Sequence, residues 1–307
     1  IDVCTAHATQ NFPSKPIRLV VPFTAGSATD TLARMIGGKM SEVWRQPVII
    51  ENRPGAGGTI GANVVAKATP DGYTLLWTGS AFTIGAALNT NLPYDPLKDF
   101  AGVTQIGSGV NALVVAPALG VKSAQDFIAY AQARPGKMLL ASAGAGTATH
   151  LSGETFRLAA GIKSVHVGFK GQPEMLIEIM AGRSHFGLTS LIVALPFVKD
   201  GKLLALAVGT PQRFPLLPDV PALVEVLPSW EKESGQSLLA PAGTPHPIRN
   251  KISKDVARIL DLPDIKERLQ AIGYAAAPTT PEEHERILRA RIEAFSKVVR
   301  LAGLRAP

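Results

Sequence analysis

The sequence predicts an α/β protein made of two successive units, each with a sheet flanked by helices. First, strands and helices alternate regularly between residues 16 and 77, which is typical of a parallel sheet. Second, the same alternation starts again at Asn111. Third, a chain of 307 residues with 46% hydrophobic and 18% charged side chains can build one large or two ordinary domains.

The first unit opens with a buried strand over residues 16–23, where an apolar run is bounded by prolines. A helix follows from Ala28, because apolar residues recur at helical spacing after it. Residues 46–59 read as a second strand and a glycine-rich turn, and residues 60–77 as a helix, an Asp-Gly turn and a third strand.

The second unit repeats this order and is followed by a helical end. The predicted elements are a strand at 111–117, a helix at 123–137 that Ser123 caps, a strand, loop and helix over 137–161, a strand at 164–169, a helix, turn and strand over 173–190, and a strand at 202–210. After a proline-rich stretch at 211–230 come a strand at 235–241 and helices at 247–260, 263–273 and 281–303.

We expect residues 13–114 and 238–307 to form one lobe and residues 115–237 the other. The strands at 111–117 and 235–241 would then cross between the lobes. Residues 1–12 read as a leader or the start of a mature chain, since Ala6-His7-Ala8 fits a signal-peptidase site. Residues 1–8 are also compatible with a remnant of the expression vector. The single cysteine, Cys4, excludes a disulfide within the chain.

The charge pattern argues against nucleic acid as a partner. The net charge is +7, but lysines and arginines are scattered singly and only 6% of residues are aromatic. Nucleic-acid grooves need clustered cations and stacking faces. No apolar run reaches the roughly 18 residues of a membrane span. We therefore expect a soluble protein, or at most a lipid-anchored one.

Two loops of small and hydroxyl residues join a strand to a helix. Thr24–Thr29 follows the first strand, and Ser142–His150 has the same architecture in the second unit. Helix N-termini offer unpaired N–H groups and partial positive charge, so such loops can bind a carboxylate or a phosphate. The ordinary alternative is an N-cap with a tight turn. The lysine of a phosphate-binding P-loop and a dinucleotide fingerprint are both absent.

Signatures of enzymes are weak. The sequence has no G-x-S-x-G nucleophile motif, and its six histidines show no metal-binding spacing. His150 is the one histidine beside a candidate loop. No pair of carboxylates suggests acid–base chemistry, so we expect neither catalysis nor a metal nor a cofactor.

Five long motifs in a fixed order carry a family resemblance that extends from Phe12 to Leu304. They are FPSKPIRLVVPFTAGSATDTLAR, QPVIIENRPGAGGTIGANVVAKATPDGYTLL, LPYDPLKDFAGV, LPDVPALVEV and LLAPAGTP. The chain resembles the Bug family, the extracytoplasmic solute-binding proteins of tripartite tricarboxylate transporters. The resemblance implies a two-lobed, type II periplasmic-binding-protein-like fold. Each lobe would have a mixed, mainly parallel sheet, and two crossover strands would join the lobes.

The resemblance also implies a function and a site. It implies a periplasmic receptor, expected as a monomer, that passes a small carboxylate to membrane permease subunits. The family's carboxylate loop maps onto residues 23–30, a second segment onto 80–83 and the facing loop onto 142–150. The expected ligand-binding residues are Phe23, Thr24, Ala25, Gly26, Ser27, Ala28, Thr29, Asp30, Ser80, Phe82, Ser142, Gly144, Thr147, His150, Phe169 and Thr189.

Departures from the family pattern bear on the ligand. Thr189 replaces a usual acidic residue, and Phe169 replaces a usual tyrosine. Losing the acid removes a partner for an ammonium group and a source of repulsion for a second carboxylate. We therefore expect a dicarboxylate, and an aromatic diacid such as terephthalate would suit Phe82 and Phe169 if they line the site.

Two other classes of protein share such a fold. An enzyme acting on a small carboxylic acid would need a cofactor-bearing cysteine or an acid–base pair in the cleft. The effector domain of a transcription regulator would need a helix-turn-helix segment to bind DNA. The sequence offers none of these features.

Overall fold

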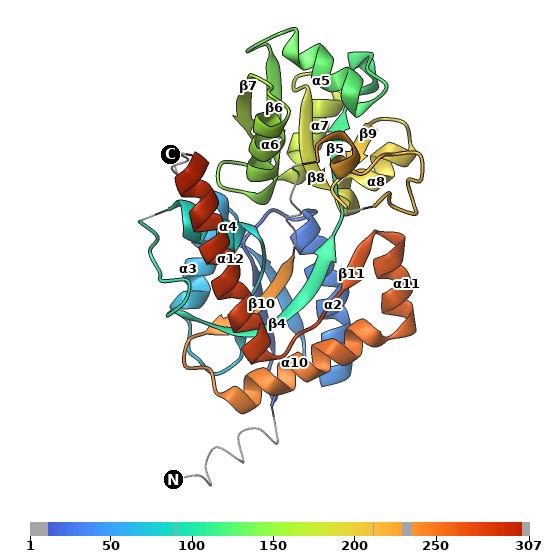
Figure 1. The fold of residues 1–307 in the computed structure, drawn as a ribbon. Coiled ribbons are helices and arrows are strands. Elements are labelled where there is room, and N and C mark those ends of the chain that lie inside the picture. Colours follow the sequence, from blue (N-terminus) through green and yellow to red (C-terminus); the bar gives the residue numbers. More distant parts are fainter. Residues whose placement is uncertain (1–11, 90, 211, 229–234, 303–307) are drawn as a thin grey trace.

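The computed structural model describes residues 12–89, 91–210, 212–228 and 235–302, and these form two lobes, each built around one sheet (Figure 1). The leader expected at residues 1–12 thus lies outside the described residues, apart from Phe12. In the part of the chain that the structure describes, no helix is long and apolar enough to span a membrane.

The first lobe has a six-stranded mixed sheet in the order β11-β4-β10-β3-β1-β2. β1 pairs in parallel with β2 and β3, whereas β10 pairs antiparallel with β3 and β4, and β11 antiparallel with β4. The strands are β1 (Ile17–Val21), β2 (Val48–Asn52), β3 (Thr74–Gly79), β4 (Phe100–Gly109), β10 (Gln236–Pro241) and β11 (Tyr274–Ala276).

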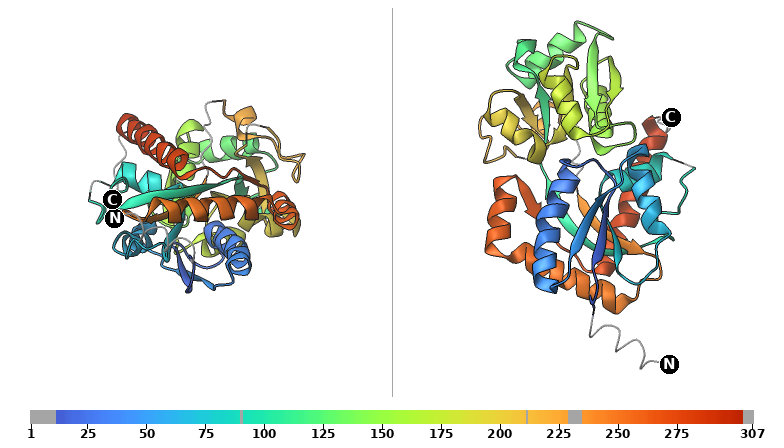
Figure 2. Two further views of the ribbon diagram at one scale, coloured as in Figure 1. Left: turned by 90° about the horizontal axis from the view of Figure 1, so that it is seen from below. Right: turned by 180° about the vertical axis from the view of Figure 1, so that it is seen from behind.

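Helices cover both faces of this sheet, because successive side chains of a strand point to opposite faces. Leu19 faces the core formed with α2 (Ala28–Trp44), α10 (His246–Asp261) and α11 (Pro263–Ala271). Val20 faces the core formed with α3 (Thr59–Ala66), α4 (Ala81–Leu88) and α12 (Pro281–Ala302). The view from below shows α2 and α12 on opposite sides of the sheet (Figure 2). The final helices thus pack on the first lobe.

The second lobe has a five-stranded mixed sheet in the order β7-β6-β8-β5-β9. β6 is parallel to β7 and β8, and β5 is antiparallel to β8 and β9. The strands are β5 (Asn111–Val115), β6 (Met138–Ser142), β7 (Ser164–Gly168), β8 (Phe186–Ser190) and β9 (Leu204–Val208). The helices are α5 (Ala124–Gln132), α6 (Ala148–Ala159), α7 (Gln172–Met180), α8 (Leu191–Lys199) and α9 (Leu223–Val226), with apolar cores on both faces of the sheet.

The chain changes sheet between β4 and β5, with Val110 alone between them (Figure 1). The boundary expected at residue 114 is therefore too late, because residues 111–115 pair entirely within the second sheet. The return boundary expected at 237 falls inside β10, which pairs entirely within the first sheet. β4 escaped prediction because three glycines interrupt its apolar pattern.

Candidate functional site

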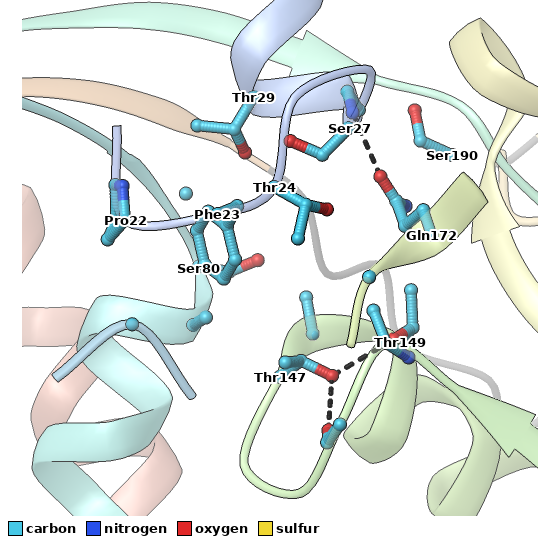
Figure 3. Close-up of a pocket in the computed structure, with 18 of the residues that line it drawn as sticks. Pro22, Phe23, Thr24, Ser27, Thr29, Ser80, Thr147, Thr149, Gln172 and Ser190 are labelled. Carbon is cyan, nitrogen blue, oxygen red and sulfur yellow. Dashed lines mark hydrogen bonds between the residues drawn. The ribbon is translucent and has the colours of Figure 1, made fainter. Parts of the chain in front are cut away.

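A cavity of about 400 Å³ lies between the lobes and takes its walls from both of them (Figure 3). The first lobe supplies the loops that follow β1, β2 and β3. The second lobe supplies the loops that follow β6, β7 and β8. In open α/β sheets this edge, at the carboxyl ends of parallel strands, is where ligands bind.

Nine of the sixteen residues expected in the site line this cavity, and they come from four separate segments. They are Phe23, Thr24, Ser27, Ala28, Thr29, Ser80, Gly144, Thr147 and Phe169. Figure 3 shows Thr24 and Ser27 on one side of the cavity, and Thr147 and Thr149 on the other. The two hydroxyl-rich loops therefore face each other across the cavity.

The first loop is a capped helix start whose donors are largely used inside the protein. Ser27 is the N-cap of α2, and its hydroxyl accepts the Asp30 N–H at 3.2 Å. The Gly26 N–H donates to the Asp30 carboxylate at 2.8 Å, and the Ser27 N–H to the Thr24 carbonyl at 3.2 Å. Of the first-turn N–H groups, that of Thr29 is left without an acceptor among the described residues.

Asp30 holds this loop together and does not line the cavity. Its carboxylate accepts hydrogen bonds from Arg34 at 3.0 Å and Asn52 at 2.8 Å, in addition to Gly26. Burial alone would raise the pKa of Asp30, but the bonds from Arg34, Gly26 and Asn52 outweigh it, so the pKa lies below its usual value. Asp30 is therefore an anion that is neutralised within the first lobe.

The second loop is held by hydroxyl groups. The Thr147 hydroxyl donates to the Gly144 carbonyl at 2.6 Å and lies 3.0 Å from the Thr149 hydroxyl (Figure 3). The Thr149 hydroxyl also accepts the Ala143 N–H at 2.8 Å. Gly144 has a φ of 113°, in the region that favours glycine. These bonds direct the first turn of α6 toward the cavity.

Ser142 and His150 stand behind this loop, outside the cavity wall. The Ser142 hydroxyl lies 2.6 Å from Nε2 of His166, and the rings of His150 and His166 stack with centroids 3.9 Å apart. Burial and the neighbouring His150 lower the pKa of His166 to about 4. Nδ1 of His150 accepts the Gly146 N–H at 3.2 Å. Both histidines thus support the loop in their neutral forms.

Phe82 and Thr189 lie away from the cavity as well. Phe82 is 5% exposed and packs in the core behind α4, with its ring 5.0 Å from that of Phe100. Helix α4 turns this residue inward, while Ser80 and Ala81 at its start line the cavity. Thr189 is fully buried behind Gln172. The remaining expected residues outside the wall are Ala25 and Gly26.

The lobes touch on two sides of the cavity, so the structure is closed. A Cβ added to Gly171 of the second lobe would lie 1.9 Å from the Thr24 hydroxyl oxygen of the first. On the other side, a Cβ added to Gly57 would lie 3.1 Å from the Ala145 carbonyl oxygen. The Gln172 side chain also accepts the Ala28 N–H at 2.9 Å (Figure 3).

Several wall residues were not expected from the sequence. Gln172, Gln236, Tyr274, Ser190 and the glycine-rich segment 54–58 all line the cavity. Tyr274 is 4% exposed, and its hydroxyl has no hydrogen-bond partner among the described residues. Burial raises the pKa of this phenol, which therefore remains a donor. The glycines at 55–58 predict a turn, and glycines also allow the backbone to approach a ligand closely, which is the sequence signal for this part of the wall.

The electrostatics of the cavity come from the backbone. Four helices, α2, α4, α6 and α7, begin at residues that line it, and the N-cap of a fifth helix, Ser190 before α8, lines it too. Among the described lining residues there is no carboxylate, and Lys170 is the charged side chain. Because helix N-termini carry partial positive charge and unpaired N–H groups, their convergence makes the cavity attractive to an anion. In the described part of the chain, no group of three or more His, Cys, Asp or Glu residues could hold a metal.

The chain is similar to known proteins over nearly its whole length. A family model described as the tripartite tricarboxylate transporter family receptor, TctC, matches residues 32–304. A UPF0065 protein of Bordetella bronchiseptica is 33% identical over 98% of this chain and 89% of its own length. Protein BugT of Bordetella pertussis is 30% identical over 95% of this chain and 89% of its own length.

Solved structures give the same result. An R. palustris protein with adipate has a TM-score of 0.92 and 34% identity, and the match covers 96% of this chain and 99% of that one. The periplasmic binding protein BugD has a TM-score of 0.92 and 28% identity, with the same two coverages. MatC from Rhodopseudomonas palustris with bound malate has a TM-score of 0.87 and 31% identity, covering 94% of this chain and 100% of that one. The two-lobed fold predicted from the resemblance is confirmed, and the chain belongs to the tripartite tricarboxylate transporter receptor family.

Proposed function

We propose that this protein is an extracytoplasmic receptor that encloses a small dicarboxylate in the cavity and delivers it to a tripartite tricarboxylate transporter permease. The observation that carries the proposal is the convergence of five helix N-termini on a cavity whose described lining has no carboxylate. Relatives solved with adipate and with malate support a carboxylate ligand. One chain closes the cavity with its own two lobes, so we infer that the receptor acts as a monomer in the periplasm.

One ligand carboxylate would lie at the first-lobe side of the cavity. Donors there are the Thr29 N–H and the Thr24 hydroxyl, which is buried without a partner among the described residues. The Ser80 residue at the start of α4 lines the same side. Each hydrogen bond to a charged group is worth about 1.5–3 kcal/mol. Three of the other N–H groups in the expected loop Thr24–Thr29, those of Gly26, Ser27 and Ala28, already donate within the protein.

The second carboxylate would lie at the start of α6 in the second lobe. Ala148 and Thr149 stand in the first turn of that helix and line the cavity. The N–H groups of a first helical turn lack partners inside their own helix. The wall also contains apolar side chains, Phe23 and Phe169 among them. An aromatic diacid such as terephthalate can pack there, but without the help expected from Phe82.

The Thr24 hydroxyl gives a clean test of the first end. Replacing Thr24 by valine keeps the shape and removes a hydroxyl that has no partner in the described structure. The fold should keep its stability, whereas affinity for a carboxylate should fall at least tenfold, which corresponds to about 1.4 kcal/mol. Ser184→Ala is the matched control, because the Ser184 hydroxyl is also buried without a partner but lies outside the cavity wall.

A ligand screen tests the function itself. Thermal shift should rank adipate, terephthalate, hexanoate and benzoate, since a ligand that binds only the folded state raises Tm. Calorimetry then gives the affinities. We expect each diacid to bind more tightly than its monoacid. Equal affinities would remove the second anchor, and no binding by any carboxylate would overturn the proposed function. Adipate binding clearly more tightly than terephthalate would exclude the aromatic preference and leave the two-ended site standing.

A further inference from the structure

The Gln172 side chain connects the two lobes directly. Gln172 is the first residue of α7 in the second lobe, and its amide oxygen accepts the N–H of Ala28, the first residue of α2 in the first lobe, at 2.9 Å (Figure 3). Its amide nitrogen lies 3.2 Å from the Thr189 hydroxyl, which is on β8 in its own lobe. The glutamine is 9% exposed and the threonine fully buried.

We propose that Gln172 is a closure latch, which caps the N-terminus of α2 from the opposite lobe and stabilises the closed arrangement before any ligand is bound. The inference rests on the proposed function only in taking closure as part of the working cycle. The latch differs from the ligand's own bonds because both of its partners belong to the protein.

The geometry explains why this bond favours closure. The Ala28 N–H is in the first turn of α2, where the helix itself supplies no acceptor. In the closed structure Gln172 supplies it, and Thr189 holds the amide so that the oxygen points at α2. When the lobes separate, water must replace the glutamine at Ala28. The net gain of such an exchange is modest, roughly a two- to tenfold change in the ratio of closed to open protein.

The latch also affects capture. A ligand enters through the open form, so a closed empty form slows association by the fraction that is closed. Removing the latch should therefore raise the association rate and the dissociation rate together. A residue with only a structural role in the second lobe would alter neither rate in this paired way.

The test measures the distance between lobes in ligand-free protein. Lys67 and Lys137 are exposed positions on opposite lobes. Spin labels or fluorophores attached to cysteines introduced at these two positions, in a Cys4→Ser background, report closure. We expect Gln172→Ala to lower the ratio of closed to open protein roughly two- to tenfold. Thr189→Val, which removes only the acceptor of the amide nitrogen, should lower it less. It also serves as the second variant if Gln172→Ala fails to fold.

Gln132→Ala is the matched control. The Gln132 amide donates to the Ala160 carbonyl at 2.8 Å inside the second lobe, so its loss should leave the distance distribution unchanged. A wild-type protein without a closed ligand-free population, or variants of Gln172 and Thr189 that match the wild type, would overturn the latch. These results need no ligand. A receptor that shows the latch but binds no carboxylate would refute the proposed function alone.

Discussion

Gly171→Ala should block closure without disturbing either lobe. Gly171 is the N-cap of α7 and has a φ of −176° and a ψ of 175°, an extended conformation that alanine adopts freely. The new Cβ, however, would lie 1.9 Å from the hydroxyl oxygen of Thr24 in the opposite lobe. The substitution therefore introduces a clash that exists only when the lobes are closed.

The size of the effect follows from the contacts. Rotating the Thr24 side chain moves its hydroxyl and Cγ2 together, but its Cβ remains about 3.0 Å from the added carbon, inside the 3.4 Å at which ordinary contact begins. Overpacking of this kind costs about 1–3 kcal/mol. That cost corresponds to about a 5- to 150-fold loss of the closed form, and to an equal loss of apparent ligand affinity if binding requires closure.

Calorimetry with the best diacid of the screen, together with the lobe-distance measurement, checks this prediction. Gly38→Ala is the control, because a Cβ added there meets nothing within 4 Å. Adding Thr24→Ala to the Gly171→Ala protein removes the hydroxyl and Cγ2 of Thr24, two of the three atoms that lie close to the new carbon. This second substitution should therefore restore much of the closed population. Wild-type closure in folded Gly171→Ala protein would refute the closed geometry described for these two residues.

Two further predictions concern stability. Burial lowers the folded-state pKa of His284 to about 3 and that of His166 to about 4, so the unfolded chain takes up protons first as the pH falls. Thermal melts should therefore show a stability contribution that is present above about pH 6.5 and is lost progressively as the pH falls toward 3. His284→Leu should flatten this slope, since both of its ring nitrogens lack partners in the described structure, and an unchanged slope would contradict the assignment. Phe82→Ala should cost about 3–5 kcal/mol in urea unfolding and leave ligand affinity unchanged. A tenfold loss of affinity would instead return Phe82 to the site.

The sequence located both cavity loops because each is a local feature. An apolar run, small and hydroxyl residues and an amphipathic helix follow one another in the chain, and that order predicts a strand, a turn and a capped helix start. Ser27 and Thr147 are N-caps in the structure. The family resemblance added the segment at Ser80, which also lines the cavity.

The residues that sequence reasoning missed depend on how the lobes sit together. Nothing near Gln172 in the chain indicates that it reaches α2, since Ala28 lies in the other lobe. The sequence also does not show which face of a short helix packs inward. Phe82 was therefore expected in the cavity wall, whereas α4 directs it into the core. The direction of the Thr189 side chain is also not evident from the sequence, because a threonine at this position can face the ligand or the protein. In the structure it faces the protein and bonds to Gln172.

The use of the first-lobe donors has a consequence for how such a receptor binds. The N–H groups of Gly26 and Ser27 are engaged within the first lobe, and Gln172 takes that of Ala28 when the lobes close. In the closed protein the first-lobe loop therefore offers a carboxylate few free donors. Further donors come from the helix starts of the second lobe, which reach the ligand only on closure. A dicarboxylate bound as proposed then interacts more strongly with the closed form than with the open one. That difference in affinity is what lets a ligand shift the population toward closure.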